Sequence, residues 1–197
     1  MLGFNSLNPI IKGCDSLNRN EALKLIESRI KNKNLRKHMI ACEAVMRGLA
    51  SHFGEDQELW AMTGLLHDLD YEETGEDMSR HGLVSAEVLE RAGFDPRGVH
   101  AIKAHAFHAE RESLLDRALF AVEPLTGLIV AAALIHPDKK LSSIDTQFIL
   151  NRFKEKAFAR GVSREEINTC HEFGLSLEDF VGLSLEAMQG VAKDLGL

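Results

Sequence analysis

Cysteine is scarce in this 197-residue sequence, and that scarcity excludes one class of metal site. The three cysteines, Cys14, Cys42 and Cys170, lie far apart and form no Cys-x-x-Cys pair. Zinc sites built from thiolates use such pairs, so no zinc finger is expected. A few scattered cysteines are also typical of a protein from a reducing compartment rather than of a disulfide-linked secreted domain.

Basic charge is in deficit as well. The chain has 23 lysines and arginines against 30 aspartates and glutamates, which gives a formal net charge of −7 at pH 7. Binding nucleic acid through its phosphates needs an excess of positive charge, so we expect no nucleic-acid partner. One local exception is RIKNKNLRK at 29–37, which has five basic residues, no acid, and leads into His38. This run is typical of a solvated face, and attraction of an anionic substrate is the alternative.

No apolar run is long enough to span a bilayer. The longest, LTGLIVAAALI at 125–135, lies mid-chain and is much shorter than the roughly 20 residues that a spanning helix needs. The sequence also does not open with a charged start, an apolar segment and a cleavage site. We therefore expect a cytoplasmic protein with no membrane partner.

Alternating strand patterns are missing too, whereas apolar residues recur at three- and four-residue spacing from Asn20 onward. This periodicity predicts helices at about 56–67 and 79–92. A further helix is expected at 113–135, where Pro124 must kink or restart it. The prediction is an all-α protein of eight or nine helices.

The domain organisation follows from the same pattern. Residues 1–19 are rich in Asn, Gly and Ser, show no period, and are predicted to form an N-terminal arm. Residues 20–197 contain no repeat, linker or low-complexity tract, so we expect one helical domain. Asn34 is a candidate cap for the helix that carries His38, and Asp95-Pro96 is a typical helix start.

Several ionisable residues fall on apolar helix faces and are therefore expected to face one interior. His38, for example, shares a face with Cys42 and Val45. The full set is His38, His67, Asp68, His81, His105 and Glu123. A single inward histidine is usually a hydrogen-bonded core residue, but this many on five helices indicate a metal site. Imidazole and carboxylate together favour Mn²⁺, Fe²⁺, Co²⁺, Ni²⁺ or Zn²⁺ over calcium or magnesium.

The spaced pattern H…HD…H…H…(D/E) made by these residues resembles the HD superfamily of metal-dependent phosphohydrolases, named after its His-Asp doublet. The resemblance covers about residues 34–135 and implies an HD-type helical bundle with its metal-site core there. In that family the first histidine, the doublet and a late aspartate hold one metal, and two-metal branches use two further histidines with the doublet's aspartate bridging. By position, the first metal would be held by His38, His67, Asp68 and Glu123. The second would be held by Asp68, His81 and His105, and His67 and Asp68 would be central to catalysis.

The sequence departs from the family pattern in three ways. Glu123 stands where the family usually has aspartate, and Asp116 is a rival for that position. The doublet is followed by Leu69-Asp70-Tyr71, not by the glycine and lysine of the cyclic-dinucleotide phosphodiesterase branch. That branch's paired histidines and Gly-Tyr-Pro motif are also missing, so we do not expect cleavage of cyclic dinucleotides.

Residues around the metal ligands carry further expectations. Candidates for phosphate binding, each more typical of a surface charge, are Lys103, Arg80, Arg111, Lys139 and Lys140. Asp70, Glu72 and Glu73 are candidates for orienting the ligand histidines as hydrogen-bond acceptors, and an acidic loop at a helix end is the alternative.

These observations favour a phosphomonoesterase or phosphodiesterase that acts on a small phosphorylated molecule, such as a nucleotide. One or two divalent transition-metal ions would activate a water for attack on the phosphate. The alternatives are an HD-type di-iron oxygenase of a small polyol or phosphonate, and a non-catalytic metal-binding regulatory module. The native metal, the number of ions and the oligomeric state stay open.

Overall fold

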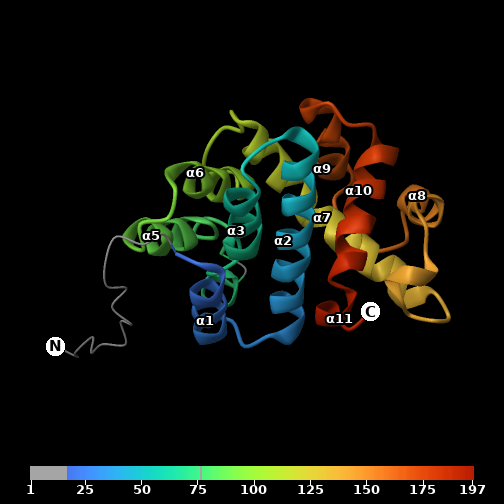
Figure 1. The fold of residues 1–197 in the computed structure, drawn as a ribbon, viewed down its shortest axis with the longest axis horizontal. Coiled ribbons are helices and arrows are strands. Elements are labelled where there is room, and N and C mark those ends of the chain that lie inside the picture. Colours follow the sequence, from blue (N-terminus) through green and yellow to red (C-terminus); the bar gives the residue numbers. More distant parts are fainter. Residues whose placement is uncertain (1–16, 76) are drawn as a thin grey trace.

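The computed structural model describes residues 17–75 and 77–197, and most of them are helical (Figure 1). Eight helices have nine or more residues: α1 (Arg19–Arg29), α2 (Lys33–Phe53), α3 (Gln57–Leu66), α5 (Leu83–Arg91), α6 (Pro96–His105), α7 (Leu114–Ile135), α8 (Thr146–Lys154) and α10 (Leu177–Gly190). Shorter helical pieces lie between or after them: α4 (Tyr71–Thr74), η1 (Leu141–Ser143), α9 (Arg164–Asn168), η2 (Thr169–Phe173) and α11 (Ala192–Leu195). These described residues contain no strand, and the all-α prediction is confirmed. The expected N-terminal arm lies mostly outside the described residues.

Helices α2 and α3 form the centre of the molecule. Figure 1 shows α2 between α3 and α10, with α7 crossing behind it, and all three helices contact α2. The close approach of α3 to α2 depends on Gly64, because a Cβ there would lie 2.7 Å from the carbonyl oxygen of Cys42. This contact brings His38 on α2 next to His67, which follows the last residue of α3.

Helix α7 runs unbroken through Pro124, so of the two predicted outcomes, a kink or a restart, the restart does not occur. A proline within a helix removes one backbone hydrogen bond. Here packing against α2, α6 and α9 holds the helix together. By length and composition α7 could cross a membrane, but 67% of its most apolar stretch is buried inside the fold, as in a core helix.

Two predicted helix starts are displaced. Asn32, not Asn34, caps α2, and its side chain accepts hydrogen bonds from the backbone N–H groups of Asn34 and Leu35. Helix α5 begins at Leu83 rather than near residue 79, because Gly82, with φ of 78°, ends a turn. His81 therefore precedes its helix. Asp95 caps α6 with Pro96 at its first position, as predicted.

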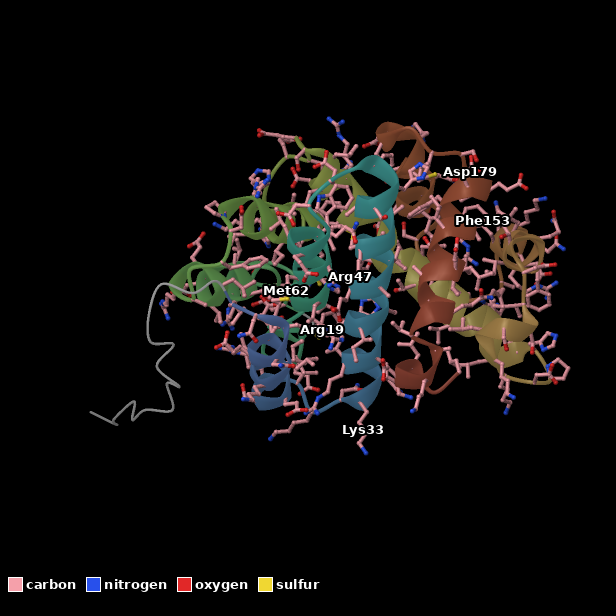
Figure 2. All side chains as sticks on the ribbon, viewed as in Figure 1. Arg19, Lys33, Arg47, Met62, Phe153 and Asp179 are labelled. Atoms are coloured by element: carbon pink, nitrogen blue, oxygen red, sulfur yellow. The ribbon has the colours of Figure 1, made fainter. Side chains whose placement is uncertain are left out.

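A group of ion pairs around the buried Glu43 joins α1 to α2. The Glu43 carboxylate accepts hydrogen bonds from Nε and Nη2 of Arg19 at 2.5 and 2.9 Å. Arg47 Nη2 lies 3.9 Å from the same carboxylate, and Figure 2 labels both arginines in the middle of the view, beside α1 and α2. Because Glu43 is buried, its pairing with Arg19 holds the N-terminal helix against the core.

Candidate metal centre

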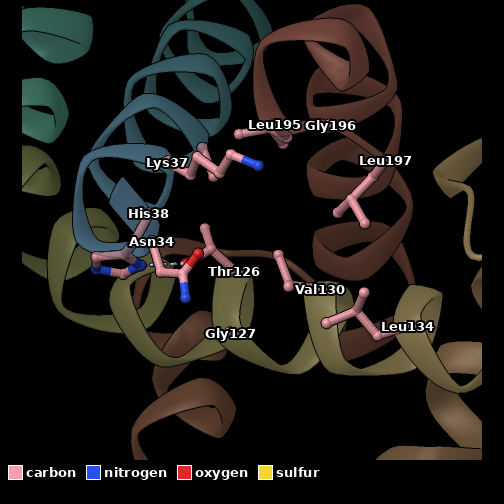
Figure 3. A pocket seen from close by; sticks show the side chains of 11 residues that line it. Asn34, Lys37, His38, Thr126, Gly127, Val130, Leu134, Leu195, Gly196 and Leu197 are labelled. Atoms are coloured by element: carbon pink, nitrogen blue, oxygen red, sulfur yellow. Dashed lines mark hydrogen bonds between the residues drawn. The ribbon is translucent and has the colours of Figure 1, made fainter. Parts of the chain in front are cut away.

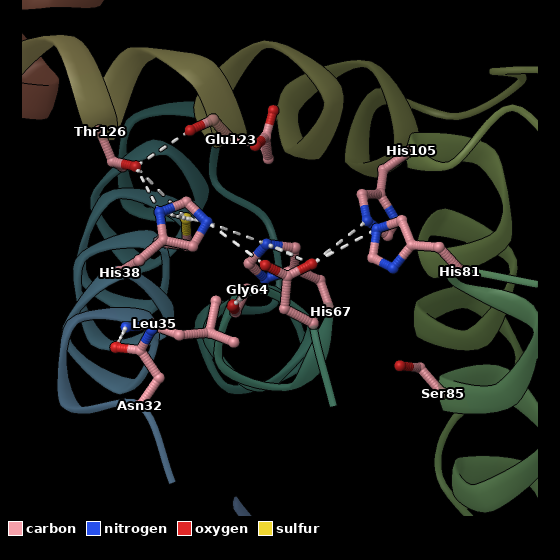
Figure 4. Close-up of polar contacts among 12 residues, drawn as sticks. Asn32, Leu35, His38, Gly64, His67, His81, Ser85, His105, Glu123 and Thr126 are labelled. Carbon is pink, nitrogen blue, oxygen red and sulfur yellow. Dashed lines mark hydrogen bonds and ion pairs between the residues drawn. The ribbon is translucent and has the colours of Figure 1, made fainter. Parts of the chain in front are cut away.

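Four histidines surround the carboxylate of Asp68, which lies in the turn after α3. Figure 4 labels the four histidines, which gather around one centre. On one side, His38 Nε2 lies 3.7 Å from Asp68 Oδ2. On the other, Asp68 Oδ1 lies 3.4 Å from His67 Nε2, 3.5 Å from His81 Nε2 and 3.8 Å from His105 Nε2. His67 is completely buried, and only His38 is partly exposed. The structure therefore brings together the predicted doublet and the three other predicted histidines.

Backbone carbonyls fix the protonation of two of these rings. His67 Nδ1 lies 2.8 Å from the carbonyl oxygen of Gly64, and His105 Nδ1 is hydrogen-bonded to that of Ile102. A carbonyl only accepts, so each Nδ1 carries the proton and each Nε2 presents a lone pair to the centre. His105 Nε2 is buried and has no hydrogen-bond partner among the described residues. Both rings are thus held in the tautomer that a metal ligand requires.

Asp70 fixes the third ring. Its fully buried carboxylate accepts hydrogen bonds from His81 Nδ1 at 2.9 Å and from the Ser85 backbone N–H at 2.8 Å. Burial alone would lower the pKa of His81, but the hydrogen bond that its ring donates to Asp70 and the charge of Asp68 raise it overall. Of the three predicted acceptors, only Asp70 contacts a histidine. Glu72 accepts hydrogen bonds from two backbone N–H groups in the connection between α1 and α2. Glu73 forms ion pairs with Arg29 and Arg80 at the surface.

Thr126 fixes the fourth ring. Its hydroxyl donates to the Glu123 carbonyl oxygen at 3.0 Å, so its oxygen is left to accept from His38 Nδ1 at 3.1 Å. His38 Nε2 then carries a lone pair, and it lies 3.3 Å from His67 Nε2, which also carries one. Cys42 Sγ is 3.8 Å from His38 Nε2, but burial raises the pKa of this thiol well above its ordinary value and keeps it neutral.

The electrostatics of the cluster fit a divalent cation. Burial lowers the pKa of His67 to about 3 and also lowers that of His38, so both rings are neutral, as metal ligands must be. Burial alone would raise the pKa of Asp68, but the neighbouring imidazoles lower it overall. An ionised, buried carboxylate facing several lone pairs is costly unless a cation is bound between them. Ligand atoms of His67, Asp68 and His105 all lie within 4.8 Å of one another.

Glu123, not Asp116, extends toward this centre. Glu123 lines one cavity with His38 and Asp68, and Figure 4 shows it on α7 beside the histidines. Among the described residues, its carboxylate is in neither group of ligand atoms that lie within 4.8 Å of one another. Burial, together with the charges of Asp68 and Glu166, raises the pKa of Glu123 to about 7. Asp116 instead caps the start of α7, where its Oδ2 accepts the backbone N–H groups of residues 112 and 113.

The cavity over the centre has a volume of about 640 Å³. Its walls include Tyr71 and Glu166, which the sequence did not single out, and the Tyr71 ring packs edge-on against His81 at 5.4 Å. Glu166 lies in α9, more than 40 residues beyond the last predicted ligand, so spacing gave no signal for it. Thr126 was also missed, although it shares a helix face with Glu123 three residues earlier.

The predicted phosphate-binding residues do not line this cavity: Lys103, Arg80, Arg111, Lys139 and Lys140 all lie elsewhere. Lys103 forms an ion pair with a glutamate of α5 at 2.6 Å, and Arg80 lies 3.6 Å from Glu73. The Arg111 guanidinium lies over the Phe120 ring at 4.0 Å. The two remaining lysines follow the end of α7 that is remote from Glu123.

The family model of the HD domain matches residues 35–133, which contain all the residues of this centre. The chain belongs to the HD-domain family. Membership implies a metal-dependent phosphohydrolase with a divalent-metal site, which agrees with the predicted chemistry. No solved structure gives a significant match.

Curated relatives with significant similarity are ribonucleases. Ribonuclease Y of Chloroflexus aurantiacus is 26% identical over 136 residues, which are 68% of this chain and 27% of the relative. Ribonuclease Y of Sulfurovum sp. is 28% identical over 153 residues, 74% of this chain and 30% of the relative. That of Geobacter sulfurreducens is 31% identical over 112 residues, 54% of this chain and 21% of the relative. The chain spans less than a third of the length of these relatives.

These relatives overturn one prediction. A small phosphorylated substrate with no nucleic-acid partner was expected, and that expectation is wrong, because the similar proteins are ribonucleases. The prediction rested on the net charge of −7, which describes the whole surface. Phosphates can also be held by a metal centre inside a pocket, and such binding does not depend on the net charge of the chain.

Proposed function

We propose that this chain is a metal-dependent phosphodiesterase that cleaves RNA. The main support for a metal-dependent reaction is that the Nε2 atoms of four histidines converge on Asp68. In each of these rings the other nitrogen, Nδ1, is hydrogen-bonded elsewhere. RNA as the substrate is supported by the similarity to Ribonuclease Y. Family membership supports hydrolysis at phosphorus rather than an oxidation.

Two sets of residues would hold metal. By their positions in the family pattern, His38, His67, Asp68 and Glu123 would form the first set, and Asp68, His81 and His105 the second. Asp68 belongs to both sets: its Oδ2 faces His38, and its Oδ1 faces His67, His81 and His105. When bound, divalent ions supply Lewis-acid chemistry, polarising phosphate oxygens and lowering the pKa of water.

Glu123 contributes a proton that is released when a cation binds. In the metal-free protein its pKa of about 7 leaves the carboxyl partly protonated near neutral pH. Bound cations favour the carboxylate form, so metal binding should expel this proton. The buried rings of His67 and His105 exclude water from one side of the metal centre. Electrostatic interactions are stronger on that side, because the local dielectric constant is lower than in water.

Cleavage of an RNA oligonucleotide with added Mn²⁺, compared with cleavage in excess chelator, tests this function. We expect cleavage only with metal and at least a 100-fold loss in Asp68→Asn, as is typical when an electrostatic group of the reaction is removed. Asp138→Asn makes the same chemical change at an exposed position and should retain full activity. RNA cleavage that survives chelation or Asp68→Asn would contradict the proposal. Oxygen uptake by the iron-loaded protein without RNA cleavage would favour the oxygenase.

A further inference from the structure

A second cavity adjoins the metal centre. It has a volume of about 330 Å³ and lies between α2, α7 and α11 (Figure 3). Asn34, His38 and Gly127 line both this cavity and the one over the metal centre, so the two meet at these residues. Its outer wall is apolar and includes Val130 and Leu134. Leu134 is 49% exposed, which leaves apolar surface open to an occupant.

Lys37 gives this cavity its charge. It is the single lysine or arginine among the described residues that line the two cavities. Figure 3 shows its side chain extending across the cavity toward Gly196. Among the ion pairs of residues 17–75 and 77–197, none involves Lys37. In contrast, the cavity over the metal centre is lined by the acids Asp68, Glu72, Glu123 and Glu166 and contains no such cation.

We propose that this second cavity holds the nucleotide next to the scissile bond of an RNA strand, with Lys37 binding its phosphate. The inference rests on the proposed cleavage of RNA. An ammonium group binds phosphate as a point charge, and the apolar wall suits the face of a base or a ribose. The Asn34 amide at the junction has both donors and an acceptor for polar atoms of that nucleotide. A strand lying in both cavities would cross the junction beside His38.

Gly127 keeps the junction open. A Cβ at this position would meet only Val162 Cγ2, at 3.7 Å, which is an ordinary contact. Alanine is also a better helix former than glycine, so Gly127→Ala should fold at least as well as the natural chain. A longer side chain, as in Gly127→Leu, would occupy the space that the two cavities share and block a strand that crosses it.

The experiment compares two substrates in the presence of Mn²⁺: an RNA octamer and bis(p-nitrophenyl) phosphate, which is too small to extend far beyond the metal centre. For Lys37→Gln we expect the ratio of kcat/KM on RNA to kcat/KM on the small ester to fall about tenfold, as for a lost charged hydrogen bond. This fall should come from a higher KM for RNA. The KM for RNA should also depend less on salt concentration, because one phosphate contact is lost. Gly127→Leu should lower the same ratio, and Gly127→Ala should lower it less.

Lys33→Gln is the matched control, because Lys33 is exposed on the same helix one turn earlier and lines neither cavity. Its ratio should equal that of the natural chain. An unchanged ratio in Lys37→Gln and Gly127→Leu, with RNA still cleaved, would overturn this inference alone. Cleavage of the small ester without cleavage of RNA would overturn both this inference and the RNA substrate, and cleavage of neither would overturn the proposed function as a whole.

Discussion

Replacement of Asp70 by asparagine tests how the centre is held together. Within the histidine cluster, the Asp70 carboxylate is hydrogen-bonded to His81, whose Nδ1 lies 2.9 Å from its Oδ1. Asparagine has the same shape, but its oxygen can serve only one of the two donors that Asp70 binds, His81 Nδ1 and the Ser85 N–H. We therefore expect Asp70→Asn to weaken metal binding through the orientation of His81, without removing a ligand.

The expected size follows from the geometry. Hydrogen-bond partners of metal-binding histidines typically contribute 10- to 100-fold in metal affinity, or about 1.4–2.7 kcal/mol. The metal-free variant should also lose about 1.5–3 kcal/mol of stability, the usual contribution of a hydrogen bond to a charged group.

This stability loss should depend on pH. Burial would raise the pKa of Asp70, but the hydrogen bonds from His81 and Ser85 outweigh it and lower the pKa. A carboxyl with a lowered pKa stabilises the fold above its unfolded value of about 3.9, and this contribution is lost as the pH falls further. The difference in free energy of unfolding between the natural chain and Asp70→Asn should therefore reach its full size at pH 7 and become smaller below about pH 4.

Isothermal titration of the chelator-stripped protein with Mn²⁺ at 25 °C measures the metal affinity directly. Glu87→Gln, the same kind of change at an exposed position of α5, serves as the control and should leave the dissociation constant unchanged. An unaltered dissociation constant in a folded Asp70→Asn protein would refute the reasoning, because His81 would then not be a ligand that Asp70 orients.

Four further changes give separate outcomes. In the metal-free protein, stability should fall as the pH rises from about 4.3 toward the raised pKa of Glu123, about 7, so Glu123→Gln should raise Tm at pH 8 while weakening metal binding. Asp116→Asn should lower Tm in thermal melts and leave metal content unchanged, because Asp116 caps α7. Replacing both His81 and His105 by alanine should leave no more than one bound ion per chain in elemental analysis. Gly64→Ala should cost about 1–3 kcal/mol in urea unfolding, because its Cβ would lie 2.7 Å from a backbone oxygen of α2.

The parts of the molecule that local periodicity controls could be predicted from the sequence. The spacing of His38, Cys42 and Val45 predicted that His38 faces the interior, and in the structure it meets His67 there. The His67-Asp68 doublet at the end of a buried helix identified the centre, because a buried aspartate needs a partner. The all-α architecture followed from the same three- and four-residue periodicity.

Features that depend on tertiary contacts could not be predicted in this way. The continuity of α7 through Pro124 is due to packing from several helices, which overrides the local cost of proline. Glu166 reaches the cavity from a distant segment, and no spacing rule connects it to the doublet. Lys37 belongs to the basic run at 29–37, which the sequence allowed to be either a solvated face or a site that attracts an anionic substrate. Lys37 differs from the other basic residues of that run because it lines the second cavity.

Equilibrium dialysis measures whether the cluster around Asp68 binds metal. Chelator-stripped protein is dialysed against Mn²⁺, and bound metal per chain is measured by elemental analysis for the natural sequence and for Asp68→Ala. We expect one or two tightly bound ions in the natural chain and none in a folded Asp68→Ala protein, because Asp68 contributes to both sets of ligands. No bound metal in the natural chain, or equal amounts in the two proteins, would contradict the account.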